Sequence, residues 1–249
     1  MMILVLVLVL CIFLFFVGGE RGAIVVTTLA GNVCVLAVTI ILLANGMPIF
    51  PIIFLATILI SYITLIQQNG KNQKTEIAFG ATGIVILLLL AAIFLLLWDA
   101  RSGGLNEIQA IQEDVMYYYN TNLHINMLQI TVCMVLLSTL GAVLDTALSI
   151  TSSLYEVILH KPDMSRREIY HSGLQIGKDI IGTTVNTLFF AYLGDSLLLF
   201  FYLKNVKYTA EVILNSKMLF QGVSAMLFSA IACLLTVPVA SAGCMLFLK

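Results

Sequence analysis

Charged residues are scarce in this sequence: only 10% of the 249 residues are Asp, Glu, Lys or Arg, whereas 61% are hydrophobic. A water-soluble domain of this size needs far more polar side chains to cover its core. Several nearly uncharged runs also exceed the roughly 18 residues that mark a membrane-spanning helix. The composition therefore excludes a soluble protein and predicts a multi-pass protein of the lipid bilayer.

Residues that would support other functions are few as well. The net charge of −1 leaves no basic surface for nucleic acid. The five cysteines lie in apolar runs without a Cys-x-x-Cys pair, and the three histidines are not spaced as metal ligands. Nucleophile, phosphate-binding and paired-aspartate protease motifs are absent. We therefore expect no enzymatic activity, no metal site, no cofactor and no nucleic-acid partner.

The apolar runs predict an all-α bundle of about seven membrane spans in one integral membrane domain, 1–249. The expected spans cover residues 2–17, 23–44, 49–67, 77–98, 125–159, 166–203 and 217–248. The longest polar segment, 99–124, has apolar residues at helical spacing, which predicts a short helix at the membrane surface. Pro238 predicts a kink in the last span.

Lys and Arg residues are distributed unevenly over this topology. With seven spans, eight of the twelve lie on the side of the C-terminus and four on the other side. The positive-inside rule then places the N-terminus outside and the C-terminus in the cytoplasm. The loop at 99–124 is expected outside and the loop at 160–171 inside.

An aspartate interrupts the apolar run of the fifth expected span. Asp145 shares a helix face of about 80° with a stripe of small and polar residues. The other members of this stripe are Gly141, Ser149, Ser152 and Glu156. A carboxylate at this depth is costly in lipid, so the stripe must face protein or water. Asp145 is therefore a candidate ion- or proton-coupling residue; the alternative is a structural hydrogen bond between helices.

A second polar stripe follows the sixth expected helix, which a capping box at Ser165 and Glu168 predicts to begin there. The stripe comprises Ser172, Gln175, Asp179, Thr183 and Asn186, with Thr187 beside it. The fifth and sixth helices are joined by a short turn, so we expect them to be neighbours, with Asp145 near Asn186 or Thr187. The alternative is that these side chains only hold helices together. Four glycines along both stripes permit close helix packing: Gly141, Gly173, Gly177 and Gly182.

Several motifs resemble those of the YibE/F-like membrane proteins. They are GAVLDTALSITSSLYE at 141–156, KPDMS at 161–165, SG at 172–173, IGKDIIGT at 176–183, NTL at 186–188, AYLG at 191–194, GGxRG at 18–22 and NGxxxKT at 69–75. The resemblance covers nearly the whole chain, whose length is similar to the shorter of two related proteins in some Gram-positive bacteria. It implies a bacterial cytoplasmic membrane protein. The polar stripes, which need a protein-facing surface, and the small residues along them predict a dimer with a longer relative or with itself. The resemblance implies no biochemical function.

Residues 141–203 also resemble one half of the SecD/SecF and RND permeases. The shared order is Gly-x-x-x-Asp, a Glu eleven residues later, a short basic linker, a capped helix and a Thr-rich span. Those permeases are proton-driven, and a carboxylate in the corresponding helix takes part in coupling; their large exported domains are missing here. The resemblance implies a transport or permease subunit coupled to the proton gradient through Asp145. The alternative is a scaffold or assembly subunit that stabilises a related partner.

Candidate coupling residues follow from both stripes. They are Asp145, Ser149, Ser152, Glu156, Asp179, Thr183, Asn186 and Thr187. The sequence leaves the substrate and the coupling ion open.

Overall fold

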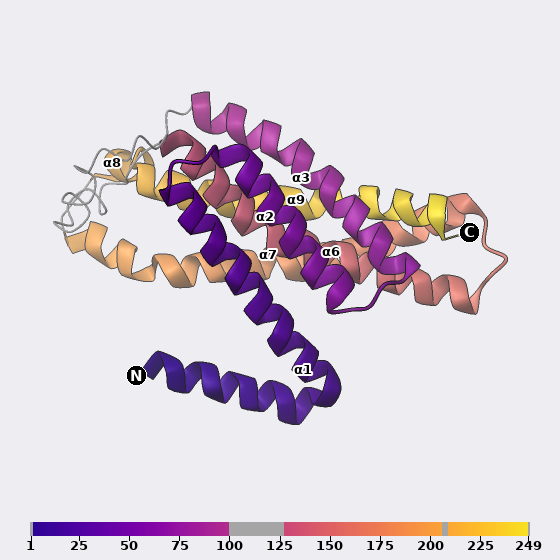
Figure 1. The fold of residues 1–249 in the computed structure, drawn as a ribbon. Helices are drawn as coiled ribbons and strands as arrows, with labels where there is room; N and C mark the ends of the chain where they lie inside the picture. Colours follow the sequence, from indigo (N-terminus) through magenta and orange to yellow (C-terminus); the bar gives the residue numbers. More distant parts are fainter. Residues whose placement is uncertain (1, 100–126, 206–208, 249) are drawn as a thin grey trace.

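The computed structural model describes residues 2–99, 127–205 and 209–248, and these residues form helices without a strand (Figure 1). The elements are α1 (Met2–Ala44), α2 (Ile49–Tyr62), the π-helix η1 (Ile63–Gln67), α3 (Gln73–Asp99), α6 (Met127–His160), α7 (Arg166–Asn205), α8 (Ala210–Leu214) and α9 (Lys217–Phe247). The predicted all-α class is confirmed. The surface helix expected within 99–124 lies outside the described residues.

Five helices of the described chain are long and apolar enough to cross a membrane, by length and composition. They cover Met2–Ala44, Ile49–Gln67, Gln73–Asp99, Leu128–His160 and Leu219–Phe247. The expected first and second spans, 2–17 and 23–44, lie on the two arms of α1, on either side of a break at Gly19, and α7 is not among the five. The seven spans and their orientation therefore stay predictions.

Helix α1 bends sharply at the GGxRG motif. Gly19 has φ 55° and ψ −131°, a left-handed conformation that glycine adopts at little cost. A Cβ added at Gly22 would collide with the backbone of Leu14, so the two arms approach closely at the bend. The N-terminal arm turns away from the bundle, and its side chains are mostly exposed (Figure 1).

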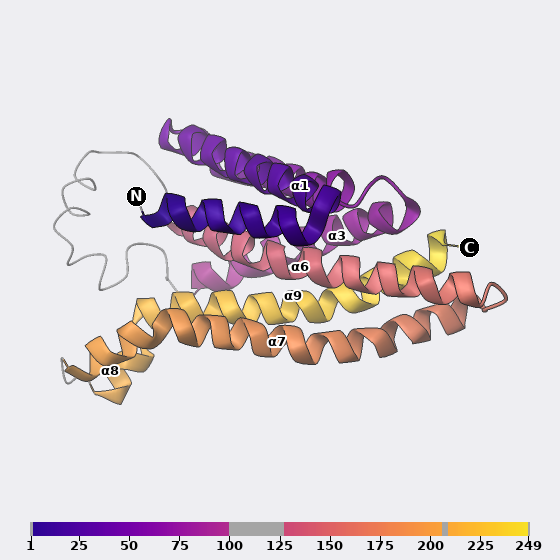
Figure 2. The ribbon, with the colours of Figure 1, turned by 90° about the horizontal axis from the view of Figure 1, so that it is seen from below.

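The centre of the bundle is formed by α3, α6 and α9. Its largest buried side chains include Leu89 and Ile93 of α3 and Leu136 of α6, each at most 1% exposed. In lipid, tight packing rather than water exclusion holds such helices together. Helix α7 packs on α9 along the outer side of this centre, and α1 and α2 lie on the other side (Figure 2).

Buried hydroxyl groups on α6 and α9 bond to their own helices. Thr146 donates to the carbonyl of Ala142 at 2.8 Å, and Ser241 donates to the carbonyl of Val237 at 2.7 Å. Such bonds to the preceding turn satisfy a hydroxyl without a partner on another helix. The hydroxyl groups on the core face of α6 and α9 therefore have hydrogen-bond partners, whereas the carboxylate of Asp145 has none among the described residues.

Local signals in the sequence set several helix ends. The backbone N–H of Ser165 donates to Glu168 Oε2 at 2.7 Å, and the N–H of Glu168 donates to Ser165 Oγ at 3.3 Å. This reciprocal pair is the predicted capping box, and α7 begins at the next residue, Arg166. Pro48 precedes the first residue of α2, and Pro238 lies inside α9, which continues as one helix.

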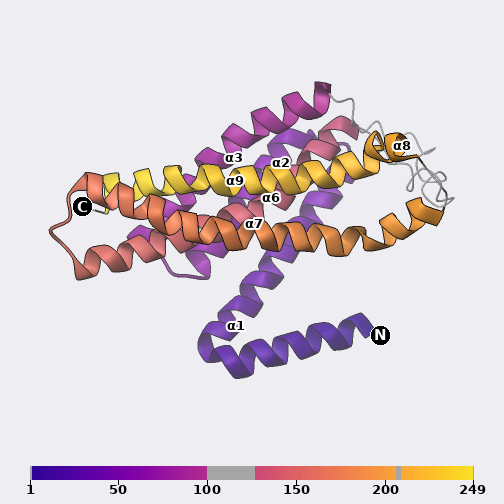
Figure 3. The same ribbon diagram turned by 180° about the vertical axis from the view of Figure 1, so that it is seen from behind.

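One end of the bundle gathers three connections of the chain. The loop between η1 and α3, the turn between α6 and α7 and the C-terminal end of α9 lie there together (Figures 1 and 3). This end carries Lys71, Lys161 and Arg166. The positive-inside rule predicts that it faces the cytoplasm.

Candidate functional site

Asp145 lies near the middle of α6, on the surface of α6 that faces α1 and η1. Its side chain is exposed at the surface of the bundle. It forms no hydrogen bond or ion pair with any residue that the structure describes. An unpaired carboxylate on a helix of this apolarity is costly in lipid, so this surface is the first place to look for function.

Asp145 borders a cavity of about 430 Å³ between α1, the end of α2, η1 and α6. The lining residues are Asn32, Leu36, Ile60, Thr64, Leu65, Gln68, Asn69, Leu137, Leu140, Gly141, Leu144, Asp145 and Leu148. Polar groups from α1 and η1 thus meet the carboxylate of α6, and leucine side chains fill the remaining wall. A cavity of this size falls within the range of small-molecule sites, about 300–1,000 Å³.

The polar wall of this cavity is a ladder of hydrogen bonds between α1 and η1. Asn32 Nδ2 donates to Thr64 Oγ1 at 3.0 Å, and Thr28 Oγ1 donates to Gln68 Oε1 at 3.3 Å. Asn32 Oδ1 is fully buried and accepts no hydrogen bond. A buried acceptor without a donor costs about 1–3 kcal/mol, so Asn32 Oδ1 is a destabilising group within this wall.

A π-helical turn positions this wall. The N–H of Gln68 donates to the carbonyl of Ile63, five residues earlier, at 3.0 Å. The carbonyl of Thr64 accepts from Asn69 Nδ2 at 2.8 Å. Single π-turns in α-helices occur frequently at functional sites because they redirect side chains and free backbone groups. Here the turn ends the span and presents Thr64 and Gln68 to α1.

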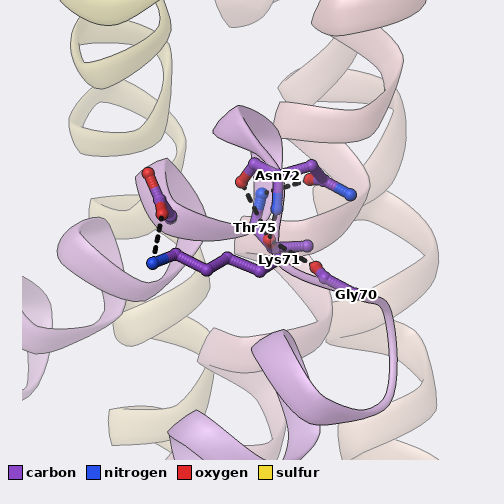
Figure 4. Close-up of polar contacts among 5 residues, drawn as sticks. Gly70, Lys71, Asn72 and Thr75 are labelled. Atoms are coloured by element: carbon purple, nitrogen blue, oxygen red, sulfur yellow. Dashed lines mark hydrogen bonds and ion pairs between the residues drawn. The ribbon is translucent and has the colours of Figure 1, made fainter.

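The NGxxxKT motif explains how the chain leaves this turn and enters α3 (Figure 4). Gly70 has φ 79°, and Asn72 and Thr75 cap each other across the first turn of α3. The N–H of Thr75 donates to Asn72 Oδ1 at 3.0 Å, and the N–H of Asn72 donates to Thr75 Oγ1 at 3.1 Å. Thr75 Oγ1 also donates to the carbonyl of Gly70 at 2.8 Å. The loop beside the cavity is therefore fixed by its own hydrogen bonds.

Two contacts add charged groups to this loop. Lys74 Nζ lies 5.7 Å from the ring centroid of Tyr155, which connects the start of α3 to α6. Lys71 Nζ lies 3.8 Å from Glu76 Oε1 on the exposed side of the loop (Figure 4). Both lysines thus interact with residues other than Asp145, and neither lines the cavity.

The second stripe does not meet Asp145, so the expected contact with Asn186 or Thr187 is wrong. Asn186 and Thr187 are exposed on α7, and the cavity around Asp145 has no lining residue from α7. Helices α6 and α7 are neighbours as expected, with Gly173 against Leu154, but Asp145 lies on the face of α6 that borders α1 and η1. Figure 2 shows α1 and α7 on opposite sides of α6 and α9.

The glycines of α7 divide into two kinds. A Cβ added at Gly173 would lie 2.8 Å from Leu154 Cδ1 and still closer to Ser241 Oγ, and a Cβ at Gly177 would collide with Val237. These glycines allow α7 to approach α6 and α9 closely. At Gly182, as at Gly141 on α6, a Cβ would have no atom within 4 Å. Both of these glycines are exposed and leave room for another molecule.

The other candidate residues lie outside the cavity. Ser149 and Ser152 are partly buried, and Glu156 and Thr183 are exposed. Asp179 lines a different, wide hollow of about 910 Å³ at the α6–α7 turn. The rest of its lining is Val157, His160, Lys161, Pro162, Asp163, Met164, Glu168, His171, Ser172, Gln175 and Ile176. The described residues contain no group of three His, Cys, Asp or Glu side chains arranged to hold a metal ion.

The sequence profile of the family described as YibE/F-like protein matches residues 6–249. The chain belongs to the YibE/F-like family. No curated protein and no solved structure matches it. The resemblance of residues 141–203 to SecD/SecF and RND permeases stays a prediction.

Sequence reasoning found the carboxylate of this YibE/F-like protein but missed the wall that faces it. Thr28 and Asn32 are four residues apart on α1, as are Thr64 and Gln68 at the end of the next span. Residues at this spacing share one helix face. Two such polar pairs on consecutive apolar helices were the signal available for pairing α1 with η1.

Proposed function

We propose that this YibE/F-like protein is a transport or permease subunit of a bacterial cytoplasmic membrane, coupled to the proton gradient through Asp145. The observation that supports this proposal is the cavity that the unpaired carboxylate of Asp145 borders together with the polar residues Asn32 and Thr64. A structural carboxylate in a membrane helix is expected to have a donor or a basic partner. Asp145 has neither among the described residues, which suits a group that gains and loses a proton or a cation.

The position of the cavity offers a path for the proton. Asn69 is exposed beside the η1–α3 loop, and Gln68 and Thr64 follow it toward Asp145 and Asn32. The membrane potential supplies about 2.3 kcal/mol per charge per 100 mV when the charge crosses the whole field. A tenfold change in an equilibrium requires only about 1.4 kcal/mol, so even part of this field can bias the charge state of Asp145.

Assembly with a second protein is part of the proposal. Asn186, Thr187 and Gly182 form an exposed patch on α7, with space for a neighbouring helix at the glycine. Amide and hydroxyl side chains on a helix in lipid favour contact with another helix. We infer a dimer with a longer YibE/F-like protein or with a second copy. A mass measurement in native nanodiscs is expected to give the dimer, and a monomer alone would contradict it.

A scaffold or assembly subunit that stabilises a related partner is the second candidate function. The same exposed patch on α7 favours it, because a scaffold needs a docking surface and no ionisable group. The two functions differ in what they require of Asp145. A scaffold tolerates any residue there that preserves the fold, whereas a coupling subunit needs the carboxylate.

Complementation of a deletion strain separates these two functions. Asp145→Asn keeps the shape of the side chain but cannot titrate, so it should abolish complementation while membrane level and partner recovery stay normal. Glu76→Gln removes an exposed carboxylate outside the cavity and is the matched control. Glu156→Gln is expected to have an intermediate effect and Ser149→Ala a smaller one. Full complementation by Asp145→Asn would support the scaffold instead.

A further inference from the structure

The Asp145 carboxylate borders the cavity as an oxygen acceptor without a donor, and a second such acceptor, Asn32 Oδ1, is buried within the cavity wall. Asn32 Oδ1 is buried and unpartnered, and Asp145 forms no hydrogen bond or ion pair within the described part of the chain. The hydrogen bonds between α1 and the end of the second span, of Asn32 Nδ2 with Thr64 and of Thr28 with Gln68, leave both acceptors unsatisfied. The missing group is therefore a donor, and the carboxylate favours one with positive charge.

The remaining wall of the cavity is apolar and large. Leucine side chains from α1 and α6 line it: Leu36, Leu137, Leu140, Leu144 and Leu148. A hard metal ion such as Ca²⁺ takes about 6–8 oxygen ligands, and leucines supply none. A single water molecule occupies roughly 30 Å³, far less than the 430 Å³ of the cavity. The volume and the leucines fit a molecule with a hydrocarbon part.

We propose that this cavity binds a small organic ammonium ion. Its N–H groups donate to the Asp145 carboxylate, and its hydrocarbon part packs against the leucines. The inference deepens the proposed function, on which it rests, because it names the class of transported solute. Asp145 is exposed at the surface of the bundle, so a bound molecule contacts the carboxylate without a change in the packing of the core.

Charge neutralisation explains why the ammonium group is selected. The carboxylate stays in an apolar setting only when it is neutral or paired. An ammonium ion pairs with the ionised carboxylate, and a proton neutralises it, so the two occupants exclude each other. A neutral molecule with the same hydrocarbon part gains the contacts with leucine but leaves the charge unpaired.

Matched probes test this selection on the full chain in nanodiscs. The probes are 4-phenylbutylammonium and 4-phenylbutan-1-ol, which share their hydrocarbon part, and titration calorimetry against empty nanodiscs corrects for binding to lipid. We expect saturable binding of the amine and at least tenfold weaker binding of the alcohol. Asp145→Asn should weaken amine binding at least tenfold and leave alcohol binding unchanged, and the control Glu76→Gln should change neither.

A second variant tests the place of binding without removing the charge. Gly141 lines the cavity, and a Cβ there has no atom within 4 Å, so Gly141→Leu adds bulk at the mouth without a clash at its Cβ. It should block the amine while thermal unfolding stays like that of the unchanged protein. Normal amine binding by folded Gly141→Leu would overturn the assignment of the cavity.

Other outcomes also overturn the inference. These are no saturable binding of the amine, equal binding of amine and alcohol, or equal amine binding by Asp145→Asn. Displacement of the amine by sodium chloride but not by potassium chloride would assign the cavity to an inorganic cation instead. If the amine fails to bind while Asp145→Asn still fails to complement, only this inference falls. If Asp145→Asn complements, the proposed function falls whatever the binding result.

Discussion

Replacing Gly177 by alanine should loosen α7 from α9, because the added methyl group has no room. The new Cβ would lie 2.9 Å from Val237 Cγ2 and 3.1 Å from Val237 Cβ, and it would collide with Cγ1. Overpacking of this kind costs about 1–3 kcal/mol. The gain of alanine over glycine within a helix, about 0.5–1 kcal/mol, offsets only part of that cost. We expect a net loss of roughly 1 kcal/mol or more in the free energy of unfolding.

Gly182 provides the matched control on the same helix. A Cβ at Gly182 has no atom within 4 Å, so Gly182→Ala should be neutral or stabilise the monomer by about 0.5–1 kcal/mol. Val237→Ala removes the γ-carbons that collide with the new methyl group. The double variant Gly177→Ala/Val237→Ala should therefore lose less unfolding free energy than the two single variants lose together. The expected difference is a coupling energy of about 0.5–3 kcal/mol.

Equilibrium unfolding in mixed micelles, followed by circular dichroism, measures these differences. We expect Gly182→Ala to have the highest unfolding free energy, the unchanged protein an intermediate one and Gly177→Ala the lowest. Equal stability of the two glycine variants, or additive effects of Gly177→Ala and Val237→Ala, would refute the close approach of α7 and α9.

Three further predictions concern the η1–α3 loop and the topology. Thr75→Val should cost about 0.5–1.5 kcal/mol in unfolding free energy for each hydrogen bond lost, because the Gly70 carbonyl loses its donor and the N–H of Asn72 loses its acceptor. An unchanged unfolding curve would contradict this. Gly70→Ala should cost about 1–2 kcal/mol in unfolding free energy because of the φ of 79° at this residue, since an added Cβ meets no atom within 4 Å. Gly70→Asn should cost less, because asparagine tolerates this conformation. Equal costs of the two variants would contradict the backbone explanation. In a cysteine-free background, an impermeant reagent outside the cell should label Asn106→Cys but not Asp163→Cys, and the opposite pattern would invert the topology.

Local interactions explain which parts of the fold the sequence could predict. The capping box at Ser165 and Glu168 and the proline before α2 act within a few residues, so their meaning does not depend on the rest of the chain. The unusual residue Asp145 could be recognised because a charge in an apolar run needs a special environment. The composition alone indicated lipid as the surroundings.

The partners of Asp145 could not be predicted, because they depend on which helices become neighbours. Adjacency in sequence correctly predicted that α6 and α7 are neighbours, but Asp145 lies on the other face of α6, toward α1 and η1. The π-turn at Ile63–Gln67 changes the direction of side chains without any residue type that marks it. The polar wall at Asn32 therefore emerged only from the packing of the helices.

The claim that Asp145 exchanges a proton has a direct test on the isolated chain. Infrared difference spectroscopy in nanodiscs follows the C=O stretch of protonated carboxyl groups as pH is changed. The account predicts a band that appears with acidification, is absent from Asp145→Asn and persists in Glu76→Gln. A spectrum of Asp145→Asn identical to that of the unchanged protein at every pH would contradict proton exchange at Asp145.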